Sequence, residues 1–331
     1  MSREVTRRYA DPLDTLWIAA AAKMGLTIER TPDAFASTDG RGTLSIGDPA
    51  SLDADDCLAQ IVFHELCHSL VEGPESFEVL DWGLTNEDAR DVSREYATLR
   101  VQAWLAGRHG LRWVLAPTTD HRAFYDGLGP DSLSGDDESA RLARVALTRS
   151  SRPPWAPHLE EALASTAQVV RGVARWSGPG SLFETLEDAR ERHPAGGWRH
   201  PQARGSCGDC AWRSERCVVT EVAVEEDWPA CEAFVASLEC GPCGACCREG
   251  FHVVEVDEED PFVRVHGSML ERTHGRLQLP RVDGRCLPLR GDGVEEPFTC
   301  ALYEDRPVSC RDFERGGESC LIARRRVGLS V

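Results

Sequence analysis

The sequence predicts an α+β protein in two parts, with an amino-terminal domain built around one metal-binding helix and a carboxy-terminal domain built around cysteines. Three observations predict this organisation. An apolar helix over residues 53–73 carries the pattern His64-Glu-x-x-His68, two short strands precede that helix at 26–30 and 42–46, and twelve of the fourteen cysteines are crowded into the carboxy-terminal part. Strands grouped ahead of helices favour an α+β layer over other arrangements.

Turn-forming segments divide the chain further. A polar, glycine-containing break follows residue 130, and the glycine- and proline-rich stretch 193–198 precedes the cysteines. We therefore expect an HExxH metal-dependent catalytic domain over residues 1–130, a helical extension and linker over 131–200, and a cysteine-rich metal-binding domain over 201–331.

The elements ahead of the central helix are short. An amphipathic helix is expected over 13–24, followed by the two strands, with Phe35-Ala-Ser as a further strand between them. In such a layer, an edge strand can form one wall of a metal cleft.

The central helix carries the strongest chemical signal in the first half. Asp53 is the expected N-cap, and Gly73 is expected to end the helix. His64 and His68 are four residues apart, so they project from one face and can share a metal ion, while Glu65 can act as a general base. The alternative is a buried helix with these polar groups by chance, which leaves them without partners at a high cost in free energy.

A third protein ligand is expected from the next helix, over residues 87–106. Glu95 lies at the edge of its apolar stripe and needs a partner there, so it is the first candidate. Glu87 lies near the helix start and is the second candidate, whereas Asp88 and Asp91 are expected on the solvated face. The stripe consists of Ala89, Val92, Tyr96, Leu99 and Ala103.

Three more elements complete the first part. Leu111 to Leu115 is expected to form a strand, and residues 138–149 and 158–174 are expected to form helices.

The composition limits the classes of partner. A formal net charge of -18 disfavours nucleic acid, because phosphate binding requires basic patches. No apolar run reaches the roughly 18 residues that cross a membrane, and the short apolar run near residue 16 lacks the features of a signal peptide. We therefore expect a cytoplasmic protein with no nucleic-acid or membrane partner.

The first group of cysteines suits one metal centre. A Cys-x-x-Cys turn supplies two sulfurs and two later cysteines complete the set, as in zinc sites or iron–sulfur clusters. In a secreted protein the same residues could pair as disulfides, but a cytoplasmic location favours metal. The group is Cys207, Cys210, Cys217 and Cys231.

The second group begins with Cys240-Gly-Pro-Cys243-Gly-Ala-Cys246-Cys247 and includes Tyr303-x-x-Arg306-Pro-x-x-Cys310-Arg. At these residues the chain resembles the cysteine-cluster family of zinc- or iron-chelating proteins known by its CxxCxxCC motif. The resemblance implies that zinc or iron, including iron–sulfur clusters, is bound by Cys240, Cys243, Cys246, Cys247, Cys286, Cys300, Cys310 and Cys320. A purely structural zinc fold remains the alternative to a functional cluster.

The HExxH part supports two chemistries. Two histidines and a carboxylate suit zinc hydrolysis and also the facial triad of non-haem iron oxygenases. Asn86-Glu87-x-x-x-Asp91 resembles the third-ligand helix of thermolysin-like peptidases, which implies a zincin-like fold and makes Glu87 the ligand.

A longer resemblance favours iron. Residues 55–106 resemble bacterial elongation factor P hydroxylase in the HExxH helix, the glycine at its end, Asp81-Trp82-Gly83, and a glutamate-containing helix that ends in Gln102-Ala-Trp. The family's aromatic insert after Asp-aromatic-Gly is replaced here by Leu84-Thr-Asn-Glu. The resemblance implies that His64, His68 and Glu95 bind iron and that the substrate is a protein, such as a translation factor.

We therefore expect an iron-dependent hydroxylase of a protein side chain fused to a cysteine-cluster domain. A gluzincin-like zinc peptidase is the first alternative. The second is a metal-binding or electron-transfer protein in which the HExxH domain is only a scaffold.

Overall fold

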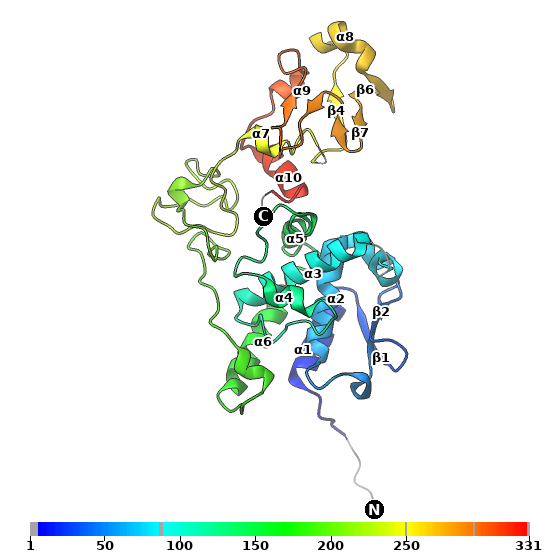
Figure 1. Cartoon of the computed structure of the whole chain (residues 1–331), viewed down its shortest axis with the longest axis vertical. Helices are drawn as coiled ribbons and strands as arrows, with labels where there is room; N and C mark the ends of the chain where they lie inside the picture. The colour runs from blue at the N-terminus through cyan, green and yellow to red at the C-terminus, as the bar shows by residue number, and fades with distance from the viewer. Residues whose placement is uncertain (1–5, 86–88, 249, 294, 330–331) are drawn as a thin grey trace, which may run out of the picture. The chain divides into compact units, whose positions relative to one another are not determined.

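The computed structural model describes residues 6–85, 89–248, 250–293 and 295–329. The chain divides into two compact units, Met1–Glu191 and Arg192–Val331. The first unit therefore includes the helices expected after residue 130 as well as the HExxH segment. Mixed helices and small sheets confirm the expected α+β class (Figure 1).

The first unit contains one small mixed sheet. β1 (Thr27–Thr31) pairs in parallel with β3 (Thr43–Gly47), and β2 (Ala36–Thr38) pairs antiparallel with β3 and forms an edge. These are the three strands that the sequence predicts, shifted by one residue. Leu44 and Ile46 of β3 are fully buried, so the central strand anchors the sheet to the helices.

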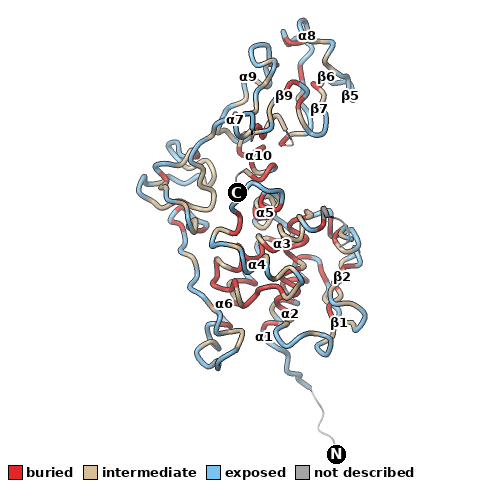
Figure 2. The backbone as a smooth tube through the Cα atoms, viewed as in Figure 1, coloured by how far each residue is buried: buried red, intermediate tan, exposed pale blue. Residues whose placement is uncertain are grey.

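Helix α2 (Leu58–Glu72) is the centre of this unit and packs against α1, α3 and α5, as Figure 1 shows. All its residues are buried except Glu65 and Glu72, so the tube in Figure 2 is red along most of it. The other helices are α1 (Pro12–Lys23), α3 (Ala89–Arg108), α4 (Arg122–Gly127), α5 (Glu138–Arg149) and α6 (His158–Ala174), with short 3-10 helices η1 (Pro49–Ser51), η2 (Pro74–Glu78), η3 (Leu80–Gly83) and η4 (Leu182–Thr185).

The expected start of the central helix at Asp53 is wrong. The carboxylate of Asp56 accepts a hydrogen bond from the Asp53 backbone N–H at 2.8 Å and closes a turn, so the acidic residues precede the helix. Cys57 is the N-cap, and the Gln60 side chain accepts a bond from its backbone N–H at 2.7 Å. The expected end at Gly73 is confirmed.

The expected strand over residues 111–115 is also wrong. Leu111, Val114 and Leu115 are all buried, a spacing that belongs to a helical turn and not to a strand. The Leu115 N–H donates to the Leu111 carbonyl at 2.9 Å, which satisfies the backbone locally.

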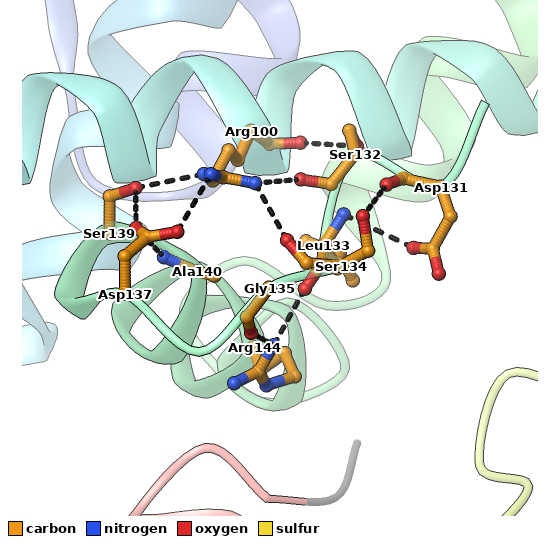
Figure 3. Close-up of polar contacts among 10 residues, drawn as sticks. All are labelled: Arg100, Asp131, Ser132, Leu133, Ser134, Gly135, Asp137, Ser139, Ala140 and Arg144. Atoms are coloured by element: carbon orange, nitrogen blue, oxygen red, sulfur yellow. Dashed lines mark hydrogen bonds and ion pairs between the residues drawn. The ribbon is translucent and has the colours of Figure 1, made fainter. Parts of the chain in front are cut away.

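Arg100 joins α3 to the segment that leads into α5 (Figure 3). Its guanidinium donates to the carbonyl oxygens of Ser132 and Ser134, to the Ser139 hydroxyl and to the Asp137 carboxylate, at 2.8–3.0 Å. Asp137 in turn caps α5 by accepting from the Ala140 N–H. One side chain thus fixes both the loop and the start of the helix that covers α3.

The second unit is poor in regular structure. Its helices are α7 (Cys240–Cys243), α8 (Pro261–His266), α9 (Val308–Arg311) and α10 (Glu318–Arg326), with η5 (Cys207–Asp209) and η6 (Gly267–Met269). Its strands are β4 (Val254–Val256), β5 (Glu271–Thr273), β6 (Arg276–Leu279), β7 (Arg281–Val282), β8 (Arg285–Cys286), β9 (Leu289–Arg290) and β10 (Thr299–Cys300). Within the described parts of both units, no helix combines the length and apolar character needed to cross a membrane.

Candidate metal centres

The two histidines of the HExxH pattern converge inside the first unit. His64 and His68 lie one helical turn apart on the face of α2 that packs against α3, and both are buried. Their Nε2 atoms are 3.1 Å apart. The two histidines are therefore largely shielded from solvent.

Residues of α3 fix the orientation of both imidazoles. The Gln102 amide N–H donates to the Leu115 carbonyl at 2.9 Å, so its Oε1 faces His64 and accepts from Nδ1, also at 2.9 Å. Thr98 Oγ1 lies 3.2 Å from Nδ1 of His68. Because Nδ1 of each ring is engaged, each Nε2 is available to a metal ion.

Glu95 is the third member of this cluster. Its carboxylate oxygens lie 3.7 Å from His64 Nε2 and 3.2 Å from His68 Nε2, so three ligand atoms surround one point. Burial alone would raise the pKa of Glu95, but the hydrogen bond and charges of the histidines outweigh it and hold that pKa at about 2. Burial likewise opposes the charged form of His68, yet contact with Glu95 leaves the pKa of His68 raised. The other candidate ligand, Glu87, lies outside the described residues.

The cluster opens into a cleft of about 460 Å³. Glu65, the candidate base, lies on its wall, and its Oε2 accepts a hydrogen bond from the Trp82 indole at 2.7 Å. Asp91, expected on the solvated face, is buried on the cleft wall and accepts from the Thr85 hydroxyl at 2.9 Å. His121 also lines the cleft, beside Tyr96 of α3.

The segment Asp81-Trp82-Gly83 links the cleft to the sheet edge. All three residues have positive φ, which costs about 1–2 kcal/mol for each non-glycine residue. The Asp81 carboxylate accepts from the Ser37 hydroxyl at 2.8 Å and the Thr38 N–H at 3.1 Å, both on β2. These bonds and the Trp82–Glu65 bond hold the strained turn in place.

On the edge strand β2, the backbone groups of Ala36 face away from β3, and this residue lines the cleft. The Phe35 carbonyl and the Asp39 N–H form hydrogen bonds with residues at the ends of β3. Because hydrogen-bonded and non-hydrogen-bonded positions alternate along an antiparallel strand, the backbone groups of Ala36 and Thr38 point away from β3. Asp81 takes the Thr38 N–H, whereas Ala36 lines the cleft. An extended polypeptide could therefore pair with Ala36 beside the histidines.

In the second unit, the first group of cysteines lines one small cavity, although no three of their sulfur atoms lie within 4.8 Å of one another as the ligand atoms of His64, His68 and Glu95 do. Burial raises the pKa of Cys231 to about 11 and also raises the pKa of Cys207, in each case with further contributions from neighbouring cysteines of the group. The lining of the cavity includes all four predicted cysteines, Cys207, Cys210, Cys217 and Cys231.

The second group surrounds a separate and larger cavity of about 840 Å³. Cys246 and Cys247 lie with their sulfurs 3.9 Å apart, and this contact, followed by burial, raises the pKa of Cys246. Burial also raises the pKa of Cys310 and brings that of Cys286 to about 11. The lining includes all eight predicted cysteines, Cys240, Cys243, Cys246, Cys247, Cys286, Cys300, Cys310 and Cys320.

Comparison with known families finds a match in the part of the chain that holds the second cysteine group. Residues 239–325 match the CxxCxxCC family, described as a putative zinc- or iron-chelating domain. The matched residues include all eight cysteines of the second group and begin after the last cysteine of the first group, Cys231. Neither the curated proteins nor the solved structures contain a significant match to the chain.

Sequence reasoning missed the residues that orient the predicted ligands. Gln102 and Thr98 lie seven and three residues after Glu95, so helical spacing places them on the same face of α3 as Glu95. That spacing is a usable signal, because a polar residue on a buried helix face requires a partner. His193, which lines the first cysteine cavity, carried no such signal in the sequence.

Proposed function

We propose that the chain is a metal-dependent enzyme in which His64, His68 and Glu95 hold one metal ion. One observation carries the proposal. Two imidazole Nε2 atoms and a carboxylate converge, while Gln102 and Thr98 engage the far nitrogens. Two Nε2 atoms 3.1 Å apart beside a carboxylate require a positive charge among them, which a proton on His68 supplies in the metal-free protein and a metal ion would supply in its place.

The donor set suits iron(II) or zinc. Two histidines and one carboxylate leave part of the coordination sphere open, and the cleft gives a substrate access to it. When bound there, iron supplies oxygen activation, whereas zinc supplies Lewis-acid activation of water or a carbonyl group.

An iron-dependent hydroxylase of a protein side chain is the first candidate. Hydroxylation inserts one oxygen atom of O₂ into a C–H bond and releases the other as water, with two electrons and two protons from an added reductant. The Trp82 indole holds one oxygen of Glu65, which supports an orienting role for this carboxylate. The free edge at Ala36 supports a polypeptide as the substrate.

A zinc peptidase is the second candidate, supported by the location of Glu65 on the same cleft wall as the histidines. In that reaction Glu65 accepts a proton from the attacking water and delivers it to the leaving amine. Its second oxygen, which the Trp82 bond does not use, is available for this transfer. Pairing with the β2 edge would present the peptide bond in an extended conformation.

The test compares the metal content and activity of full-length variants purified without oxygen. Glu95→Ala and His68→Ala should each lose one metal equivalent relative to the wild type, whereas Glu78→Ala, an exposed glutamate, should lose none. Full metal content in Glu95→Ala would refute the ligand assignment.

Activity then separates the candidates. The hydroxylase is supported if the lost metal equivalent is iron and if elongation factor P gains one oxygen atom when oxygen and ascorbate are supplied. Zinc and cleavage of casein support the peptidase. Metal that is unchanged by both ligand variants would favour the third alternative, in which only the cysteines bind metal.

A further inference from the structure

The segment 192–236 has a cysteine cavity but very little regular structure. Among its described residues the only helix is the three-residue η5, and isolated bridges such as Arg199 with Cys231 and Arg213 with Cys217 connect the loops. Backbone bonds such as that from the Cys207 N–H to the Trp228 carbonyl, at 2.8 Å, fold the loops around the sulfurs. A segment this short with so little secondary structure typically depends on a covalent or metal cross-link.

His193 is a hydrogen-bond donor to this cluster and not a ligand. Its Nε2 lies 2.8 Å from the Pro229 carbonyl, which can only accept, so Nε2 carries the proton. Its Nδ1 accepts from the Ala195 N–H at 3.1 Å. The same Nε2–H lies 3.5 Å from the sulfur of Cys207, which places an N–H donor against a prospective thiolate.

Two further donors lie buried around the same cavity. The Trp212 indole N–H and the Thr220 hydroxyl have no hydrogen-bond partner among the described residues, and both side chains line the cavity. An unpaired buried donor costs free energy, so an acceptor is expected nearby. Metal-bound sulfur is such an acceptor, because it is negatively charged.

We propose that residues 192–236 form a second thiolate metal centre, separate from the CxxCxxCC domain. Cys207, Cys210, Cys217 and Cys231 supply the ligands, and His193 positions and tunes the Cys207 sulfur. Four thiolates can bind either one zinc ion or one iron–sulfur cluster, and both are held through the same sulfur ligands. The proposal does not depend on the HExxH site, because none of these residues belongs to it.

The first experiment uses the wild-type full-length chain purified without oxygen. Native protein is alkylated with iodoacetamide before and after removal of metal, and the labelled cysteines are mapped by mass spectrometry. We expect the four cysteines to be protected before removal and labelled afterwards. Labelling of all four in the native, metal-loaded protein would overturn the proposal, whatever happens at the HExxH site.

The second experiment identifies the metal. A Cys210→Ser/Cys217→Ser variant should lose either one zinc or the iron and acid-labile sulfide of one cluster, while the CxxCxxCC domain keeps its own metal. Cys57→Ser, which changes a helix N-cap to another residue that caps well, should keep the full content. Wild-type metal and sulfide contents in the double variant would overturn the proposal even if labelling were slow.

The role of His193 has a separate readout. With iron bound, loss of an N–H donor to sulfur in His193→Ala should shift the reduction potential to a more negative value, and His193→Gln should restore part of it. With zinc bound, cobalt substitution should show a displaced sulfur-to-metal charge-transfer band in His193→Ala. An unchanged potential or band would refute the tuning role.

Discussion

Gln102 orients the His64 ring in the candidate metal site of the first unit. Its amide spans from the Leu115 carbonyl to His64 Nδ1, both at 2.9 Å, and it is fully buried. Gln102→Leu removes both hydrogen bonds without creating a large cavity, since the two side chains have similar size. We predict that the variant folds but binds metal more weakly, because the His64 ring is no longer held with Nε2 toward Glu95.

The expected magnitude follows from the two broken bonds. Each of the two buried groups left unpaired costs about 1–3 kcal/mol, so the apo protein should lose about 2–6 kcal/mol of stability. Loss of an orienting partner typically weakens metal binding by about 10–100-fold. At a free metal concentration of 100 times the wild-type Kd, metal stabilises the wild type by about 2.7 kcal/mol, and this falls to about 0.4 kcal/mol if binding weakens 100-fold.

The assay is competition with a chromophoric chelator, together with thermal unfolding at fixed metal concentration, on full-length protein with filled cysteine sites. Gln168→Leu is the control, because Gln168 is an exposed glutamine on α6. It should change neither quantity. A Kd in Gln102→Leu equal to the wild-type Kd would refute the view that this amide sets the His64 tautomer.

Three further predictions test the surrounding structure. Arg100→Ala should lower the free energy of unfolding of the first unit by about 2–4 kcal/mol, because four hydrogen bonds to the segment that leads into α5 are lost. The measurement is urea unfolding, with Arg141→Ala as a control at an exposed residue. An unfolding midpoint equal to that of Arg141→Ala would contradict this prediction. Burial opposes the charged form of Asp137, but hydrogen bonds from Ser139 and Ala140 outweigh this effect and hold the pKa of Asp137 below its ordinary 3.8. The ionised carboxylate should therefore stabilise the fold fully above pH 3.8, and this stabilisation should disappear as the pH falls through the lower folded pKa. Asp137→Asn should flatten this part of a pH–stability curve. Asp81→Ala should leave the metal content unchanged but reduce activity, because β2 and Trp82 lose their anchor, and full activity would show that the turn has no positioning role.

The sequence predicted elements best where local chemistry sets them. The helices expected over 138–149 and 158–174 have those bounds as α5 and α6, because Asp137 caps one and the proline-rich stretch before His158 delimits the other. Prediction failed where the hydrogen-bond partners of the backbone set the local structure. Asp53 has the features of an N-cap, but Asp56 closes a turn with it, and Leu111 to Leu115 has a strand's composition but a turn's hydrogen bonds.

The same distinction holds for the candidate sites. Spacing alone grouped His64 with His68, and the stripe argument selected Glu95, whose carboxylate lies beside both Nε2 atoms in the structure. The spacing of Gln102 and Thr98 from Glu95 indicates that both need partners, but it does not say which groups these partners are. Only the packing of α3 on α2 gives these two side chains their imidazole partners.

The candidate metal sites of the two units offer ligands of different hardness, and this difference bears on which unit would carry the proposed reaction. Two imidazoles and one carboxylate leave coordination positions of a metal ion open for a substrate. Four thiolates around one zinc ion or one cluster leave no such position. The cleft beside the histidines also reaches the free backbone edge at Ala36 and the carboxylate of Glu65. An open coordination position on a bound metal, together with this strand edge and a proton-accepting group, would meet the requirements of the proposed reaction on a polypeptide. The cysteine groups have sulfur ligands suited to electron transfer or structural support, so the proposed enzymatic function is assigned to the first unit.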